Sequence, residues 1–214
     1  MKPIIFCNIA RMNYYKGIID GVDEPENGGS YVNKYKNAHE ANNFDYFNFP
    51  NDNTDYCAGF VMLARTSKEK DTELHIEKIN GLELAKNQEL VDNVIVVFCA
   101  KSNKIDGVRV VGWYKNATVY RYPQEINFES GYIQQFNFID KKDNCVLLPL
   151  GERYLAKWIV PRSGHDGYKF GFGRSNVWYA QDLGEDTGLK AYVEKMSQQI
   201  EEYNGENWID KEVR

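Results

Sequence analysis

Closely spaced cysteines are absent from this chain of 214 residues. Its four cysteines lie far apart in sequence, and none belongs to a Cys-x-x-Cys pair; they are Cys7, Cys57, Cys99 and Cys145. Most structural zinc sites are built from paired cysteines, so no such site is indicated. Because Cys7 and Cys99 lie inside apolar runs, where a free cysteine acts as a small hydrophobic residue, we expect reduced thiols.

Long hydrophobic segments are absent as well. No stretch approaches the roughly 20 apolar residues that a membrane-spanning helix needs. The apolar run that follows Met1-Lys2-Pro3 is too short for the core of a signal peptide with its cleavage site. The sequence therefore predicts a cytoplasmic protein without a membrane partner.

Common catalytic motifs are also missing. The chain has no Gly-x-Ser-x-Gly element, no phosphate-binding loop and no complete Gly-x-Gly-x-x-Gly. Its three histidines, His39, His75 and His165, have no metal-binding spacing. The segment 99–101 supplies a nuclease-like lysine but lacks the accompanying carboxylate. We therefore expect no metal and no cofactor, and no particular reaction is indicated.

The composition predicts one folded domain. Hydrophobic residues make up 43% of the chain, which suffices for a core, and charged residues make up 27%. We expect a single domain over 1–214, with a core at about 3–204 and a polar, frayed tail at 205–214. The 26 basic and 31 acidic residues give a net charge of −5, which argues against a sequence-independent nucleic-acid coat.

The apolar pattern predicts an α+β fold. Buried strands are expected at 3–9, 56–65, 92–100 and 145–150, with a partly exposed strand at 74–79 and a short helix at 81–90. Apolar residues at three- and four-residue steps predict a C-terminal amphipathic helix, which Asp186 or Thr187 can cap. We expect a mixed, strongly curved or barrel-like sheet against which this helix packs.

The longest β-prone run covers 108–121. Gly112 within it predicts a bulge or a close approach of another group. Lys115-Asn116 can form a turn, and Tyr122-Pro123 is expected to end the strand. One interpretation is a core hairpin with a buried tryptophan. The other is a binding platform in which Trp113 and Tyr114 stack on a ring, while Lys115, Asn116 and Arg121 supply polar contacts.

A second aromatic and polar segment resembles the first. It contains Gly173, Arg174, Ser175, Asn176 and Trp178. If the two segments meet, they form a pocket with two aromatic walls, as a flipped base or another flat heterocycle requires. Asn116 and Asn176 would then read base edges, and Lys115, Arg121 and Arg174 would meet phosphate. The alternative is that both tryptophans are core residues and the glycines form turns.

Two further segments combine aromatic and amide side chains. Residues 33–53 have neither helical nor strand periodicity, and long ordered loops of this kind are often functional. Residues 128–138 are similarly rich in aromatic and amide groups. His39 and Glu40, in the first segment, are candidate acid–base residues; alternatively, His39 is a lone polar residue on a loop.

Four motifs resemble a family of uncharacterised bacterial proteins. They are Phe-Cys-Asn-Ile at 6–9, Gly-Gly-Ser-Tyr-Val at 28–32, Val-Val-Gly-Trp-Tyr-Lys-Asn-Ala-Thr-Val-Tyr-Arg at 110–121 and Gly-Arg-Ser-Asn-Val-Trp-Tyr-Ala at 173–180. Members of that family occur alone or with restriction-type endonuclease domains such as HNH. The resemblance implies a restriction or defence setting and a partner nuclease. The expected fold is also similar to PUA-like readers of modified bases, the group that includes SRA, EVE and YTH domains.

These observations lead to three functional hypotheses. The first is a nucleic-acid-binding module that reads a modified or flipped base. The second is an enzyme or sensor that acts on a free nucleotide or small metabolite in the same pocket. The third is a protein-interaction module whose aromatic loops form an interface. A basic stripe leading to the pocket would favour the first, a neutral or acidic rim the second, and a large apolar patch the third.

Overall fold

A single mixed β-sheet organises the described part of the protein. The computed structural model describes residues 1–26, 39–50, 52–63, 73–101, 104, 106–128, 131–181 and 183–213; the Gly-Gly-Ser-Tyr-Val motif at 28–32 lies outside them. Within these residues the sheet has nine strands. They are β1 (Ile4–Asn8), β2 (Tyr46–Asn48), β3 (Asp55–Gly59), β4 (Leu90–Lys101), β5 (Val108–Asn127), β6 (Ile133–Lys141), β7 (Cys145–Leu147), β8 (Ile159–Val160) and β9 (Val177–Trp178).

The sheet is open, which makes the expected barrel wrong and confirms the broader α+β prediction. The strand order is β2-β3-β6-β5-β4-β1-β9, while β7 and β8 pair with β5. β1 and β4 are parallel, and the other pairings are antiparallel. The end strands β2 and β9 have three and two residues and do not pair with each other, so the sheet stays unclosed.

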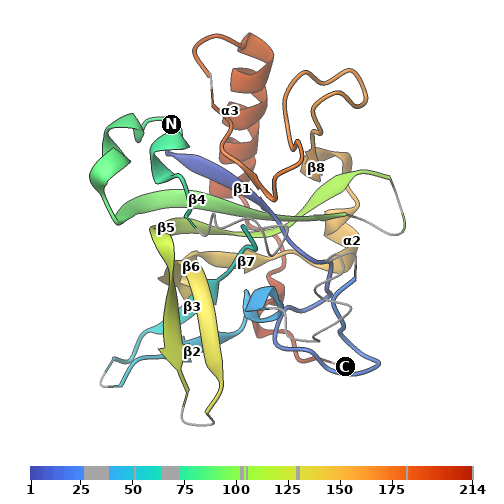
Figure 1. Ribbon diagram of the computed structural model, residues 1–214. Helices are drawn as coiled ribbons and strands as arrows, with labels where there is room; N and C mark the ends of the chain where they lie inside the picture. Colours follow the sequence, from blue (N-terminus) through green and yellow to red (C-terminus); the bar gives the residue numbers. More distant parts are fainter. Residues whose placement is uncertain are drawn as a thin grey trace.

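Two apolar cores cover the two faces of the central strands. β4 lies between β1 and β5, and its segment 94–100 is buried throughout, as expected for a strand covered on both faces. Side chains alternate across the sheet, so Trp113 enters one core and Tyr114 enters the other. β2, β3 and the far half of β5 with β6 lie on the side of the central strands opposite the C-terminal helix (Figure 1).

Helices are few and mostly short. α2 (Leu150–Arg153) forms one turn, and α3 (Thr187–Glu201) packs its apolar stripe on the sheet. The Asp186 side chain accepts hydrogen bonds from the backbone N–H groups of Gly188 and Leu189, which confirms the predicted cap. Six 3-10 turns complete the described elements: η1 (His39–Asn42), η2 (Ile76–Lys78), η3 (Glu83–Asn87), η4 (Lys142–Asn144), η5 (Ala156–Trp158) and η6 (Trp208–Asp210). None of the described helices has the length and apolar character of a membrane span.

Several local expectations were wrong. β5 runs without a break from Val108 to Asn127, so neither a turn at Lys115-Asn116 nor a stop at Tyr122-Pro123 exists. The expected strand at 74–79 and helix at 81–90 are the 3-10 turns η2 and η3. The expected frayed tail contains η6, whose Ile209 is buried, because β7 contacts it.

Candidate ligand-binding site

The predicted stacking pair is not a binding platform. Trp113 is fully buried, 5.2 Å between ring centroids from Trp158 and 5.2 Å from Tyr203. Tyr114 is fully buried on the opposite face, and its hydroxyl donates a hydrogen bond to the carbonyl oxygen of Asn43. Both rings are enclosed by protein, so the expected buried tryptophan is confirmed, but the expected hairpin is wrong because β5 is continuous.

Lys115 and Asn116 lie at the sheet surface and are engaged by other side chains. The Lys2 ammonium donates to the Asn116 side-chain oxygen at 2.6 Å, and the Asn116 backbone N–H donates to Asp140 at 2.7 Å. The Lys115 ammonium lies 3.8 Å from a carboxylate oxygen of Glu201, at the end of α3. These contacts tie β5 to neighbouring elements and form no pocket with Trp113.

Arg121 has a structural role, because its guanidinium is bonded to groups of the fold and is not directed into a binding pocket. Its guanidinium donates to the carboxylates of Glu73 and Glu77. Its remaining N–H groups donate to three backbone carbonyls, those of Ala85, Lys86 and Gln88. This arrangement fastens η2 and η3 to β5, and it uses the whole donor fork of the arginine.

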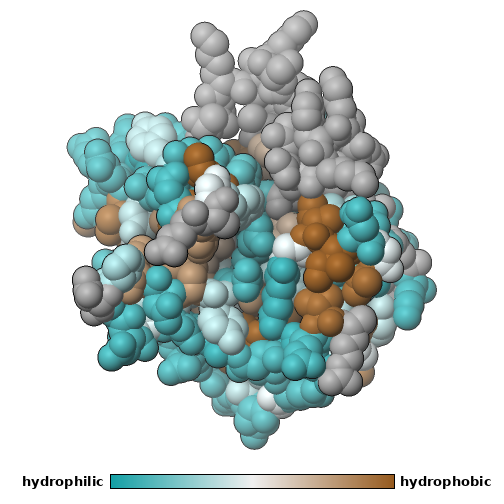
Figure 2. Space-filling view, turned by 90° about the horizontal axis from the view of Figure 1, so that it is seen from below, coloured by the Kyte–Doolittle hydropathy of each residue, from teal (hydrophilic) through white to brown (hydrophobic). Residues whose placement is uncertain are grey.

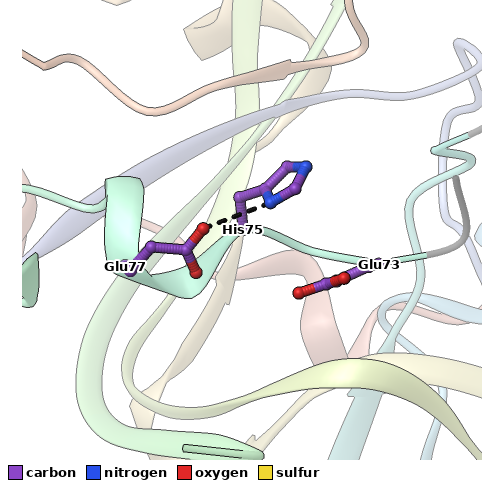
Figure 3. Close-up of side chains that lie close together, drawn as sticks. All are labelled: Glu73, His75 and Glu77. Carbon is purple, nitrogen blue, oxygen red and sulfur yellow. Dashed lines mark hydrogen bonds and ion pairs between the residues drawn. The ribbon is translucent and has the colours of Figure 1, made fainter. Parts of the chain in front are cut away.

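The carboxylates beside Arg121 form the one described group of three residues with metal-ligand spacing (Figure 3). Ligand atoms of Glu73, His75 and Glu77 lie within 4.8 Å of one another, and the His75 ring nitrogen is 3.2 Å from Glu77. However, both glutamates already pair with Arg121. A metal ion would sit beside the positive guanidinium and compete with it, so these residues fit an ion-pair network better than a metal site.

The second predicted segment is an exposed turn followed by a packed strand. Gly173, Arg174 and Ser175 are exposed, and the Ser175 hydroxyl accepts from the N–H of Val177. The Asn176 side chain donates to the Met62 carbonyl. Trp178 is half-buried and stacks on Phe6 with centroids 4.6 Å apart.

A broad hollow of about 680 Å³ adjoins Trp178, and its walls include Lys169, Phe170 and Asp186. Trp113 is not among its lining residues. The two predicted segments therefore do not combine into one pocket.

His39 and Glu40 do not behave as an acid–base pair. The buried Glu40 carboxylate accepts from the backbone N–H groups of Ala10 and Met62, and burial raises its pKa. The His39 ring packs edge-on against Phe60, and burial lowers its pKa. Glu40 thus joins three segments of the fold, and His39 packs against the same region.

A half-open hollow that the sequence did not predict as a unit lies between η1, β2, β3 and β6. We call it the β2–β6 cavity, and its volume is about 230 Å³. Five residues with polar side chains line it: Asn42, Asp45, Tyr46, Tyr132 and Gln134. Its other walls are Phe47, Ala58 and Phe128. Figure 2 shows the molecule from below the view of Figure 1, the side toward which β2 and the hairpin of β5 and β6 project; hydrophobic residues lie among hydrophilic ones on this side.

Aromatic rings continue from the cavity along the surface. Tyr132 stacks on Phe128 at 6.0 Å, and Phe128 contacts Phe47 at 5.7 Å. Phe49 then meets Phe47 at 5.2 Å and Tyr56 at 5.4 Å. Tyr132 and Phe49 are each 40% exposed, so these rings present faces or edges to solvent as well as to one another.

The cavity polar groups are held in place by internal hydrogen bonds. The Asn42 amide nitrogen donates to the Tyr132 hydroxyl at 2.7 Å and to the Gln134 oxygen at 3.2 Å. The Gln134 amide nitrogen donates to the His39 carbonyl at 2.9 Å, which joins η1 to β6. A ligand would therefore meet a preorganised wall.

Asp45 supplies the cavity's acidic group. Desolvation raises its pKa, although a hydrogen bond from the Tyr46 N–H and the charge of Lys16 act in the opposite direction. Lys142 lies over the Tyr46 ring, 3.8 Å from its centroid, but it also pairs with Asp210 at 2.7 Å. The described cations near the cavity thus leave its carboxylate without a salt bridge.

Two separate segments that the sequence pattern singled out build this cavity. Asn42, Asp45 and Phe47 come from the aperiodic segment 33–53, of which 33–38 and 51 lie outside the described residues. Phe128, Tyr132 and Gln134 come from the aromatic and amide-rich segment 128–138. The aromatic and polar composition of each segment was visible in the sequence, but no feature of either segment indicated that the two lie together in the fold.

No protein-family model, curated protein or solved structure matches the chain. The resemblance to an uncharacterised bacterial family, and the similarity to PUA-like readers, therefore stay predictions.

Proposed function

We propose that the protein binds an unpaired base of a single-stranded or locally opened nucleic acid in the β2–β6 cavity. The observation that carries the proposal is the combination of aromatic walls with fixed amide, hydroxyl and carboxylate groups in one small cavity. Ligand pockets for whole drug-sized molecules measure about 300–1,000 Å³. A volume of about 230 Å³ suits a single ring system.

Aromatic rings beyond the cavity favour a nucleic-acid strand over an isolated base as the ligand. From Phe47 in the cavity wall, Phe49 and Tyr56 extend the aromatic surface away from Phe128. Proteins that bind single strands use aromatic side chains on which successive bases stack, and this stacking tolerates any sequence. The bases next to the captured one would have such surfaces available.

A free nucleoside or nucleotide is the second candidate ligand. The observation in its favour is the acidic character of the site, where Asp45 faces the cavity and the nearby Lys142 is paired with Asp210. A nucleic-acid backbone gains affinity from basic side chains, whereas a single small ligand needs few of them. The net charge of −5 points in the same direction.

Binding of fluorescent ten-nucleotide single strands tests the proposal. Phe128→Ala is expected to weaken binding roughly 5- to 150-fold, because one base–aromatic stack contributes about 1–3 kcal/mol. Tyr122→Ala is the matched control, since Tyr122 is 49% exposed and does not line the cavity. Circular dichroism would verify that both variants are folded.

The outcomes separate the two candidates. Tighter binding of strands than of free nucleosides, with a selective loss in Phe128→Ala, supports the nucleic-acid function. Equal affinity for free nucleosides would replace it with the small-ligand function. Absence of binding to either kind of ligand at low salt, or equal losses in both variants, would refute base binding in this cavity.

A further inference from the structure

The hydrogen-bond donors of the β2–β6 cavity are already used within the protein. The Gln134 amide nitrogen donates its two hydrogens to the carbonyls of His39 and Gln135, at 2.9 and 3.1 Å. Its oxygen accepts from Asn42 and from the Tyr132 hydroxyl, at 3.2 and 2.7 Å. A side-chain amide has two N–H donors and two acceptor sites, so Gln134 is saturated.

Asn42 and Tyr132 have no donor left for a ligand either. Both hydrogens of the Asn42 amide are directed to Tyr132 and Gln134. The single hydroxyl hydrogen of Tyr132 is directed to Gln134. The Tyr46 hydroxyl is likewise engaged, in hydrogen bonds with Lys142 and Asp210. The polar side chains that line the cavity therefore offer a ligand acceptors.

Asp45 is the strongest of these acceptors. One carboxylate oxygen accepts from the N–H of Tyr46 at 3.1 Å, which occupies one of about four lone-pair sites. No described residue forms a salt bridge with this carboxylate. Hydrogen bonds from a neutral N–H to an ionised carboxylate are shorter and about twice as strong as those between neutral groups.

A cavity whose polar side chains only accept hydrogen bonds, and whose strongest acceptor is a carboxylate, discriminates among the bases. Guanine has a ring N–H beside an exocyclic amino group, which can donate to both oxygens of one carboxylate. Adenine and cytosine place an acceptor nitrogen beside their amino group, and uracil and thymine flank their N–H with carbonyls. Each of these other base edges would place at least one acceptor lone pair opposite an oxygen of the Asp45 carboxylate, and the two would repel each other.

We infer that the β2–β6 cavity selects guanine, with the Asp45 carboxylate accepting from the ring N–H and the 2-amino group. The inference rests on the proposed function, because it names the base that the same cavity holds. A well-formed bidentate pair discriminates against a wrong base by roughly tenfold to a hundredfold.

The experiment uses the full chain and ten-nucleotide oligothymidylates in which one central base is varied. Guanine is compared with hypoxanthine, which lacks the 2-amino group, and with adenine, cytosine and xanthine. We expect the strand with guanine to bind at least tenfold more tightly than unsubstituted oligothymidylate, and hypoxanthine to lose most of that gain.

Asp45→Asn provides the decisive variant. Its oxygen can still accept from the Tyr46 N–H, so the fold should be retained, but its amide nitrogen now presents a donor. The guanine preference should disappear, and the strand with xanthine should gain affinity, because its 2-carbonyl accepts from the new amide. Asp166→Asn is the matched control, because Asp166 is exposed and lies outside the cavity lining.

The possible results separate guanine selection from base binding as such. Binding of all strands with equal affinity, or a guanine preference that survives in Asp45→Asn, would overturn the guanine inference and leave the proposed function standing. A failure of every strand to bind would overturn both.

Discussion

At the scale of single residues, Arg121 shows that a basic side chain next to aromatic residues need not serve a ligand. Its guanidinium makes five hydrogen bonds within the fold, two of them to carboxylates. Arg121→Lys keeps the charge but loses the planar fork, so the buried Ala85 carbonyl and the part-buried contacts to Lys86 and Gln88 would lose donors. We expect a loss of about 3 kcal/mol in the free energy of unfolding, measured with urea.

The matched control for this prediction is Arg174→Lys. Arg174 is exposed, and substitutions at such surface sites usually change stability by less than about 0.5 kcal/mol. A similar stability in both variants would show that the Arg121 network contributes little.

The contact between Arg121 and Glu77 should also affect how the free energy of unfolding changes at acid pH. Desolvation acts to raise the pKa of Glu77, but hydrogen bonds from its own backbone N–H and from Arg121 outweigh it, and the pKa is lowered. A carboxylate with a lowered pKa in the folded state stabilises the protein above its unfolded pKa, and this contribution is lost as the pH falls through the folded value. Between about pH 4.3 and that lower value, wild type should therefore lose more stability than Arg121→Lys.

At the scale of secondary-structure elements, β5 shows what a local pattern can and cannot specify. Its β-prone residues predicted a strand, and Gly112 predicted a bulge or a close contact. Both occur: the β4–β5 register shifts beside Gly112, and a Cβ there would lie 2.3 Å from the Val146 carbonyl oxygen. The turn at Lys115-Asn116 was wrong because β4 and β6 extend the pairing of β5 on its two edges. Long-range pairing therefore overrode a turn-forming dipeptide.

The C-terminal segment contains the element η6, which its polar composition did not predict. The Asn207 side chain accepts from the Leu147 N–H at 2.9 Å and donates to the Cys145 carbonyl at 2.9 Å, so it acts as a short extension of the ladder beside β7. Asn207→Ala would leave the Leu147 N–H and the Cys145 carbonyl of β7 without this partner. We expect the free energy of unfolding, measured by thermal or urea denaturation, to fall by about 2 kcal/mol. Asn204→Ala is the control, since Asn204 is exposed; an equal effect would contradict this role.

At the scale of the whole molecule, the β2–β6 cavity depends on contacts between distant segments. Residues 39–58 and 128–134 each have the composition of a binding surface, but their meeting is determined by the pairing of β3 with β6 and of β6 with β5. Composition and periodicity describe neighbours along the chain, whereas the pairing of β3 with β6 joins residues such as Gly59 and Phe138, which are about two fifths of the chain apart. For this reason the α+β class and the C-terminal helix were predictable, but the open sheet and the site were not.

The two hydrophobic cores bury the thiols of all four cysteines. Cys7, Cys57, Cys99 and Cys145 are all free and buried, and burial raises the pKa of Cys7, Cys99 and Cys145. Because the thiolate is the reactive form, a thiol that is buried and protonated reacts only when the structure opens. At pH 8 we expect Ellman's reagent to modify none of the four within minutes in the native protein, and all four in guanidinium chloride.

Ser175→Cys supplies the positive control for this experiment, because Ser175 is exposed in the turn before β9 and a thiol there should react at once. Reaction of the four native thiols should proceed at a common rate that follows global unfolding, since they are distributed over β1, β3, β4 and β7. One native thiol that reacts as fast as the introduced cysteine would mean that its part of the sheet opens independently. In that case the two cores would not form one cooperative unit, and the β2–β6 cavity would have to be treated as a part of the fold with its own stability.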